Sequence, residues 1–279
     1  MVSSSRDGDD APAAGVRRAA IGDGGDQRRA PDVSRLRSLI RRVLPPQLRR
    51  TLTRLRRWPP VGHVRFGSLR RLRPFSREWG FDRGQPIDRY YIERFLALHR
   101  MDIRGGVLEV GSDHYTRTFG RERVVRSEVL HVADALPGVT LVADLTSADH
   151  IPADSFDCLI LTQTLQCLYD VPAAIRTLHR ILKPAGVALV TFPGISKVSR
   201  EDMERWGYYW SFTTASARRL FGEFFEPRNL QVEAHGNVLT AIAFLHGIAT
   251  EELESEELDY HDPDYELLIT VRARKSERA

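Results

Sequence analysis

Residues 107–120, VLEVGSDHYTRTFG, join a short apolar run to a glycine. The run 107–110 has the composition of a buried strand, and Gly111 follows it directly. A strand that runs into a glycine is typical of the first ligand loop of a parallel α/β sheet, because backbone N–H groups can approach a ligand where no side chain intervenes. The second and third glycines of such loops are missing, and Ser112 and its polar neighbours stand in their place. The stretch predicts a strand and a ligand-binding turn of unusual composition.

The segments around this stretch alternate between strand and helix patterns. A helix that we expect to be capped by Asp88 comes first. After it we expect strands at 107–110, 123–127, 140–143, 156–161 and 186–192, helices at 171–182 and 213–222, and a late strand 230–236, helix 237–248 and strand 265–274. Alternation at this spacing predicts an α/β fold with a mostly parallel, Rossmann-like sheet and helices on both faces.

Length and composition limit the class of protein. The 279 residues suit one domain plus a tail. No apolar run of about 18 residues predicts a transmembrane helix, and the N-terminus shows no apolar signal stretch, so we expect a cytoplasmic protein. The two cysteines, Cys158 and Cys167, lack CxxC spacing, which argues against a zinc site.

Charge divides the chain into a basic head and an acidic body. Residues 1–84 hold 20 arginines against 8 acids, a net +12, and residues 85–279 hold 21 basic against 29 acidic side chains, a net −8; together these make the stated +4. An acidic body would repel a phosphate backbone, so a nucleic-acid partner is not expected.

The basic head is expected to contain two parts. Residues 1–33 have almost no large apolar side chains and are predicted to be a disordered tail. Residues 34–79 are predicted to be a basic amphipathic arm, with leucines at helical spacing interrupted by Pro45 and Pro46. Residues 34–73 would bind a membrane surface or a protein partner; the alternative is that they pack on the acidic body or stay disordered. The folded domain is expected at 80–279.

Polar residues follow the predicted strands on the side where ligands bind in open parallel sheets. Glu128 follows the second strand and could accept both hydroxyls of a ribose. Asp144, beside Leu145, follows the third and could accept from an adenine amine. Gln163 follows the fourth and faces the same crevice, and Gln163 and Leu145 are further candidate cofactor contacts. The loop lacks the G-x-G-x-x-G that a dinucleotide pyrophosphate needs, which excludes an NAD(P) dehydrogenase.

Over residues 85–275 the chain resembles class I S-adenosylmethionine-dependent methyltransferases of the small-molecule, type-11-like branch. Glu109 and Gly111 match the start of the first motif of that family, E/D-x-G-x-G-x-G, and Glu128 and Asp144 match its ribose and adenine acids. FDCLILTQTLQCLYD (156–170) and LKPAG (182–186) resemble two later family segments. The resemblance implies S-adenosylmethionine as the cofactor and a late antiparallel strand in the sheet.

The resemblance also suggests roles for the loop residues. Ser112, Tyr115 and Thr116 would complete the methionine end of the cofactor site with their hydroxyls, beside Glu109 and Gly111; alternatively they point to solvent or cap the next helix. Many relatives have Glu-His where this chain has Gln166 and Cys167, so the role of that histidine has moved or is unnecessary. His114 is the candidate general base, because it lies in the cofactor loop. In-line methyl transfer can also proceed by alignment alone. No metal ligands are expected.

Acceptor contacts are expected from an aromatic cluster after the fifth strand. Its members are Trp206, Tyr208, Tyr209 and Trp210. Such rings suit a sugar or a flat scaffold, or they form a hydrophobic plug on the sheet. Residues 83–96 are expected to form a lid on the cofactor, with Arg89, Tyr90 or Tyr91 facing inward, and Tyr91 is the candidate substrate contact.

The expected function is metal-independent O-methylation of a sugar or of a glycosylated or secondary metabolite, as in methyltransferases encoded among glycosyltransferase and natural-product genes. A small-molecule or glycan acceptor is therefore the expected partner, and no oligomeric state is predicted. The alternatives are an N- or C-methyltransferase, or a degenerate methyltransferase-fold binding protein tethered through its basic arm, peripheral to the membrane.

Overall fold

The protein is described from a computed structural model, which covers residues 45, 47–48, 58–133 and 138–277. The chain divides into two compact units, Met1–Arg70 and Arg71–Ala279. The expected tail at 1–33 and residues 34–44, 46 and 49–57 of the expected basic amphipathic arm lie outside the described residues. In the first unit the 3-10 turn η1 (Gly67–Leu69) is described. No helix within the described ranges is long and apolar enough to cross a membrane.

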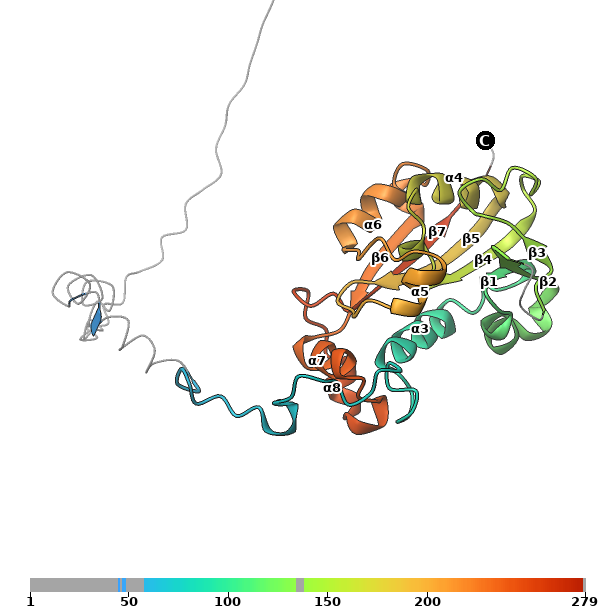
Figure 1. Cartoon of the computed structure of the whole chain (residues 1–279). Coiled ribbons are helices and arrows are strands. Elements are labelled where there is room, and N and C mark those ends of the chain that lie inside the picture. The colour runs from blue at the N-terminus through green and yellow to red at the C-terminus, as the bar shows by residue number, and fades with distance from the viewer. Residues whose placement is uncertain (1–44, 46, 49–57, 134–137, 278–279) are drawn as a thin grey trace, which may run out of the picture. The chain divides into compact units, whose positions relative to one another are not determined.

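The second unit is built on a seven-stranded sheet in the order β3-β2-β1-β4-β5-β7-β6 (Figure 1). The strands are β1 (Gly105–Val110), β2 (Val124–His131), β3 (Leu141–Val142), β4 (Phe156–Thr162), β5 (Leu182–Pro193), β6 (Leu230–His235) and β7 (Leu268–Arg274). Neighbours from β3 to β5 pair in parallel, whereas β7 runs antiparallel to both β5 and β6. The predicted Rossmann-like sheet with a late antiparallel strand is confirmed.

Helices cover both faces of this sheet. The helices of the described residues are α3 (Ile87–Leu98), α4 (Val171–Ile181), α5 (Arg200–Arg205), α6 (Thr214–Phe221), α7 (Val238–His246) and α8 (Ser255–Asp259). Apolar residues of α4 and α6 join one buried cluster, and those of α3 and α7 join a second. Helices α4 and α6 therefore bury their apolar faces against one side of the sheet, and α3 and α7 bury theirs against the other side.

Short turns connect these elements. They are the π-helical turn η2 (Thr116–Gly120) and the 3-10 turns η3 (Arg121–Arg123), η4 (Leu165–Cys167), η5 (Pro227–Asn229) and η6 (Thr250–Glu252).

Two local features differ from the sequence-based expectations. Strand β2 continues to His131, beyond the expected end at residue 127, because it pairs with β1 up to Val110 and with β3. Helix α3 begins at Ile87 after Pro86, so the expected cap Asp88 is wrong: it lies in the first turn and is buried. The second unit includes residues 71–79, where Phe75 and its neighbour donate backbone N–H groups to the His246 carbonyl.

Candidate active site

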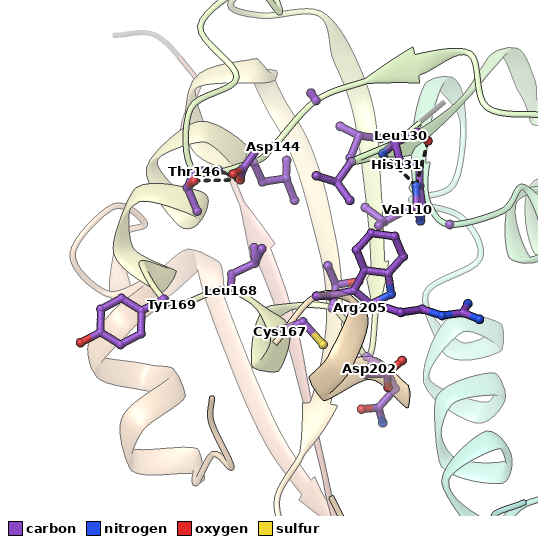
Figure 2. Close-up of a pocket in the computed structure, with 18 of the residues that line it drawn as sticks. Val110, Leu130, His131, Asp144, Thr146, Cys167, Leu168, Tyr169, Asp202 and Arg205 are labelled. Atoms are coloured by element: carbon purple, nitrogen blue, oxygen red, sulfur yellow. Dashed lines mark hydrogen bonds between the residues drawn. The ribbon is translucent and has the colours of Figure 1, made fainter. Parts of the chain in front are cut away.

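A cavity of about 740 Å³ lies at the carboxyl ends of β1, β2 and β4 (Figure 2). Its walls come from the end of β1, residues 130–133 after β2, residues 143–146 after β3, the segment 162–170 around η4, and α5 with the residues that follow it. In Figure 2, Asp144 lies toward one end of the cavity and Cys167 and Asp202 toward the other. The volume falls in the range of small-molecule sites, which is about 300–1,000 Å³.

Gly111 brings the end of β1 to the cavity wall. Its φ is +90°, and a Cβ built there would meet nothing within 4 Å. Its N–H donates to the Leu130 carbonyl at 3.0 Å, which links the turn to β2. Since L side chains rarely adopt this conformation, glycine both permits the turn and leaves the backbone open to a ligand. This open backbone is the feature that fits the expected cofactor.

Glu109 holds the loop after β1 in place through hydrogen bonds to its buried carboxylate. Its carboxylate is 2% exposed and accepts from the Tyr115 N–H at 3.1 Å and from the Thr116 N–H and hydroxyl, both at 2.7 Å. Burial raises the pKa of this carboxyl, although these hydrogen bonds oppose the shift. Glu109 does not line the cavity. It therefore satisfies backbone donors of the loop rather than facing a ligand.

The other loop residues also lie outside the cavity wall. Tyr115 is buried, and its hydroxyl accepts from Arg89 at 2.8 Å. Thr116 is held by Glu109, and Ser112 is exposed; both line a second cavity on the other side of the loop. His114 is exposed, and its ring meets the Tyr115 ring edge to face at 5.1 Å. Only Gly111 of the expected loop contacts lines the larger cavity.

Two of the expected cofactor residues line the cavity beyond β3. Asp144 accepts from the Thr146 N–H and hydroxyl, each at 2.8 Å, through one carboxylate oxygen. Leu145 is buried and forms an apolar part of the wall. The arrangement leaves the other Asp144 oxygen available to a donor.

Glu128 lies three residues before the end of β2, opposite Leu108 of β1. Its carboxylate accepts from the Thr140 hydroxyl and does not line the cavity. The end of β2 is instead His131, which does line it. Sequence reasoning missed His131, because it ended the second strand before this residue and the pairing of β2 with β1 and β3 extends the strand.

Gln163 lines the cavity from the turn after β4. Its φ is +50°, a region that non-glycine residues rarely adopt, and its N–H donates to the Thr191 carbonyl at 2.9 Å. The side chain of Gln166 donates to the Gln163 carbonyl at 2.7 Å. Strained conformations of this kind cost about 1–3 kcal/mol and cluster at ligand sites.

Two of the four residues of the aromatic cluster line the cavity, and the other two do not. Trp206 and Tyr209 line the cavity, and the Tyr209 N–H donates to the Gln166 carbonyl at 2.8 Å. Tyr208 is half-buried away from it, and the Trp210 indole donates to the Leu168 carbonyl at 3.0 Å.

Tyr91, the expected lid residue, lies outside this cavity. Its ring is buried and stacks on His235, with ring centroids 5.6 Å apart. Its hydroxyl donates to the Leu258 carbonyl at 2.8 Å. Tyr91 lines a separate cavity with His235 instead.

Charged residues of α5 that the sequence did not single out also line the cavity. Asp202 is half-buried and makes no hydrogen bond or ion pair through its carboxylate with the described residues. Arg205 is paired with Glu201 at 2.9 Å. Burial raises the pKa of the neighbouring Cys167 thiol to about 11, and the Asp202 charge adds to the shift. In the sequence, Asp202 and Arg205 lie between the predicted fifth strand and the aromatic cluster, and this position could have identified them as candidate site residues.

Within the described part of the chain, no group of three or more His, Cys, Asp or Glu side chains could hold a metal ion.

Comparison with known proteins identifies the family. A family model described as a methyltransferase domain matches residues 62–240, more than half of the chain, and the protein belongs to this methyltransferase family. The match confirms the resemblance to class I S-adenosylmethionine-dependent methyltransferases and supports S-adenosylmethionine as the cofactor. A search of curated protein sequences gives no match.

Several solved structures are similar to this one. A SAM dependent methyltransferase from Archaeoglobus fulgidus is 11% identical, with 67% of this chain and 94% of that chain covered and a TM-score of 0.46. A putative sarcosine dimethylglycine methyltransferase from Galdieria sulphuraria is 13% identical, with coverages of 68% and 87% and a TM-score of 0.47. N-methyltransferase NodS from Bradyrhizobium japonicum, in complex with S-adenosyl-l-homocysteine, is 15% identical, with coverages of 69% and 89% and a TM-score of 0.44.

Proposed function

We propose that the protein methylates a hydroxyl of a small molecule, a sugar or a glycosylated or secondary metabolite, with S-adenosylmethionine as the donor. One observation carries this proposal: a single cavity is lined by Gly111 and Asp144 on one side and by Asp202, Trp206 and Tyr209 on the other. A methyltransferase must hold donor and acceptor in one space, because in-line displacement depends on their alignment.

Residues around β1, β3 and β4 would hold the cofactor. The open backbone at Gly111 and the strained turn at Gln163 face the cavity where the methionine part would bind. Asp144 would accept from the adenine amine, and Leu145 would pack on the base. The cofactor supplies a methyl group on a sulfonium, which needs no further activation.

Asp202 is the proposed proton acceptor, in place of His114. The Asp202 carboxylate lines the cavity and has no partner among the described residues, whereas His114 is exposed and does not line it. As the acceptor oxygen bonds to the methyl carbon and the carbon–sulfur bond breaks, the hydroxyl proton would pass to this carboxylate. A positioned base contributes about 10²- to 10⁴-fold to such a step.

The charges of the wall favour a neutral or cationic acceptor. Among the residues that the structure describes, three carboxylates line the cavity, on Asp144, Asp170 and Asp202, and the one arginine, Arg205, is paired with Glu201. An anionic acceptor would therefore be repelled. The same combination of a carboxylate with Trp206 and Tyr209 also suits a cationic amine, which makes N-methylation the second candidate.

We further propose that the protein acts in the cytoplasm, in natural-product or glycan biosynthesis. Residues 34–73 would provide a contact with a membrane surface or a protein partner. The net charge of −8 over residues 85–279 argues against a nucleic-acid substrate.

Methyl-labelled S-adenosylmethionine incubated with an extract of the source organism tests the proposal. The labelled product should carry an O-methyl group, recognised by its carbon-13 chemical shift. An N-methyl signal would favour the second candidate. If folded protein releases no heat with S-adenosylmethionine or S-adenosylhomocysteine in calorimetry, the binding-protein alternative replaces the enzyme.

Two variants test the proton acceptor in the same assay. Asp202→Asn should reduce turnover about 100-fold or more, and His114→Gln should leave it close to the wild-type value. The reverse pattern would restore His114 as the base.

A further inference from the structure

We propose that His131, and not Glu128, is the residue of β2 that binds the ribose of the cofactor. This inference rests on the proposed function, since it concerns the same cavity and the same cofactor. It assigns the ribose contact to an imidazole ring, in place of the Glu128 carboxylate that the resemblance implied.

The register of the sheet places His131 at the cavity. Val110 is paired with Leu130, so the next residues, Gly111 and His131, lie at the same level where β1 and β2 end. The Gly111 N–H donates to the Leu130 carbonyl at 3.0 Å, which holds the two strand ends together. Both Gly111 and His131 line the cavity. A ligand that contacts the Gly111 backbone is therefore within reach of the His131 ring.

Glu128 is engaged elsewhere. It is paired with Leu108, two positions before the end of β1, and its carboxylate accepts from the Thr140 hydroxyl. A second, weaker interaction joins it to Arg126 at 3.9 Å. To reach the cavity, Glu128 would have to break the Thr140 contact and pass the end of its own strand. Its role in this structure is to tie β2 to the segment that precedes β3.

The His131 ring is held with one nitrogen free. Its Nδ1 lies 3.0 Å from the Ala133 N and 2.9 Å from the Ala133 O, so the Ala133 backbone occupies this nitrogen in either tautomer. Nε2 has no hydrogen-bond partner among the described residues. The Trp206 ring contacts the imidazole edge to face, with centroids 5.0 Å apart. The ring is thus oriented from two sides and can offer Nε2 to a ligand hydroxyl.

A single ring nitrogen can make one hydrogen bond to the ribose, where a carboxylate could accept from both hydroxyls. We therefore expect His131 to contribute the free energy of one hydrogen bond. This corresponds to about a 5- to 10-fold effect on the dissociation constant.

Calorimetry with S-adenosylhomocysteine tests the assignment on the full-length protein. His131→Ala should weaken binding about 5- to 10-fold, and the matched variant Glu128→Gln should stay within about twofold of wild type. His131→Asp should bind at least as tightly as wild type, because a carboxylate then stands at the strand end. Circular dichroism confirms that each variant is folded, and His131→Gln replaces the alanine variant if that one is not.

A second measurement observes the ring itself. The imidazole signals of His131, identified by their absence in His131→Gln, should shift in NMR spectra when S-adenosylhomocysteine is added, and those of exposed His114 should not. Weaker binding by Glu128→Gln together with unchanged binding by the His131 variants would overturn the assignment. Failure of the wild-type protein to bind S-adenosylhomocysteine would instead overturn the proposed function.

Discussion

The imidazole of His131 and the indole of Trp206 meet edge to face, with their ring centroids 5.0 Å apart and their planes at 84°. His131 is the last residue of β2, and Trp206 directly follows α5. The two rings therefore come from segments that are far apart in the sequence. Both line the same cavity. The contact joins the wall that would hold the cofactor to the wall that would hold the acceptor.

Trp206→Ala is expected to weaken binding of S-adenosylhomocysteine about 2- to 10-fold. The variant removes a ring contact worth about 0.5–1.5 kcal/mol, which orients His131. Calorimetry measures the change. The control is Trp210→Ala, because the Trp210 indole donates to the Leu168 carbonyl and does not line the cavity. Equal affinities for the two variants would show that the ring contact does not support cofactor binding.

Glu109→Ala should lower the free energy of unfolding by about 2–3 kcal/mol. The change leaves the Tyr115 N–H and the Thr116 N–H and hydroxyl without their buried acceptor. Urea unfolding followed by circular dichroism measures the loss. Glu109→Gln keeps one acceptor oxygen and should lose about half as much. An alanine variant as stable as wild type would mean that water replaces the carboxylate.

Cys167 is expected to react with iodoacetamide about 100-fold more slowly at pH 8 than a free cysteine. Its pKa of about 11 keeps the thiol protonated, and thiolate is the reactive form. Mass spectrometry of the folded protein gives the rate. The other cysteine, Cys158, is fully buried and should remain unmodified.

Asp202→Asn should accelerate alkylation of Cys167, because the Asp202 charge contributes to the raised pKa of the thiol. Cys167→Ser provides the unreactive control. An unchanged rate would place the Asp202 carboxylate too far from the thiol to act on it, and would weaken the case for this carboxylate inside the cavity.

His235 should make the protein less stable as the pH falls from about 6.5 to 4. Burial, with smaller effects of His261 and Arg94, lowers the pKa of His235 to about 4, although Glu233 opposes the shift. Since the unfolded chain binds this proton at a higher pH than the folded chain, the stabilisation is complete above about 6.5 and is lost toward 4. We expect a loss on the order of 1–3 kcal/mol, because the ring is partly exposed.

Urea unfolding of wild type and His235→Gln at several pH values measures this effect. The difference in the free energy of unfolding between the two proteins should change with pH only in the window from 6.5 to 4. His114→Gln is the control, because His114 is exposed. A constant difference for His235→Gln would contradict the lowered pKa.

The predicted strands and helices were confirmed where their pattern is local. The apolar runs of β1, β4 and β5 and the amphipathic stripe of α4 could be read directly from residue spacing. The end of β2 could not be read in this way. Its length depends on pairing with β1 and β3, which are neighbours in space, and the apolar residues after Glu128 fit a strand or a loop equally well.

The candidate site was predicted in part. Gly111, Asp144, Leu145 and Gln163 line the cavity as expected residues at strand ends. The hydroxyls of the loop do not, because Glu109 draws Thr116 and the Tyr115 backbone into the interior. The spacing of residues in the sequence does not show that these loop residues make hydrogen bonds to Glu109 and do not face the cavity.

The sequence by itself determined the class of protein: alternating apolar periods specify a parallel sheet, and a glycine after its first strand marks the ligand edge. Only the tertiary structure decided which side chains reach that edge. His131 stands at the cavity because β1 and β3 pair with β2 up to its last residues, and Asp202 and Trp206 join it because α5 returns to the same strand ends. The local spacing of apolar residues determines the helices and strands. Pairing between residues that are distant in the sequence determines where each strand ends and which side chains lie at that end.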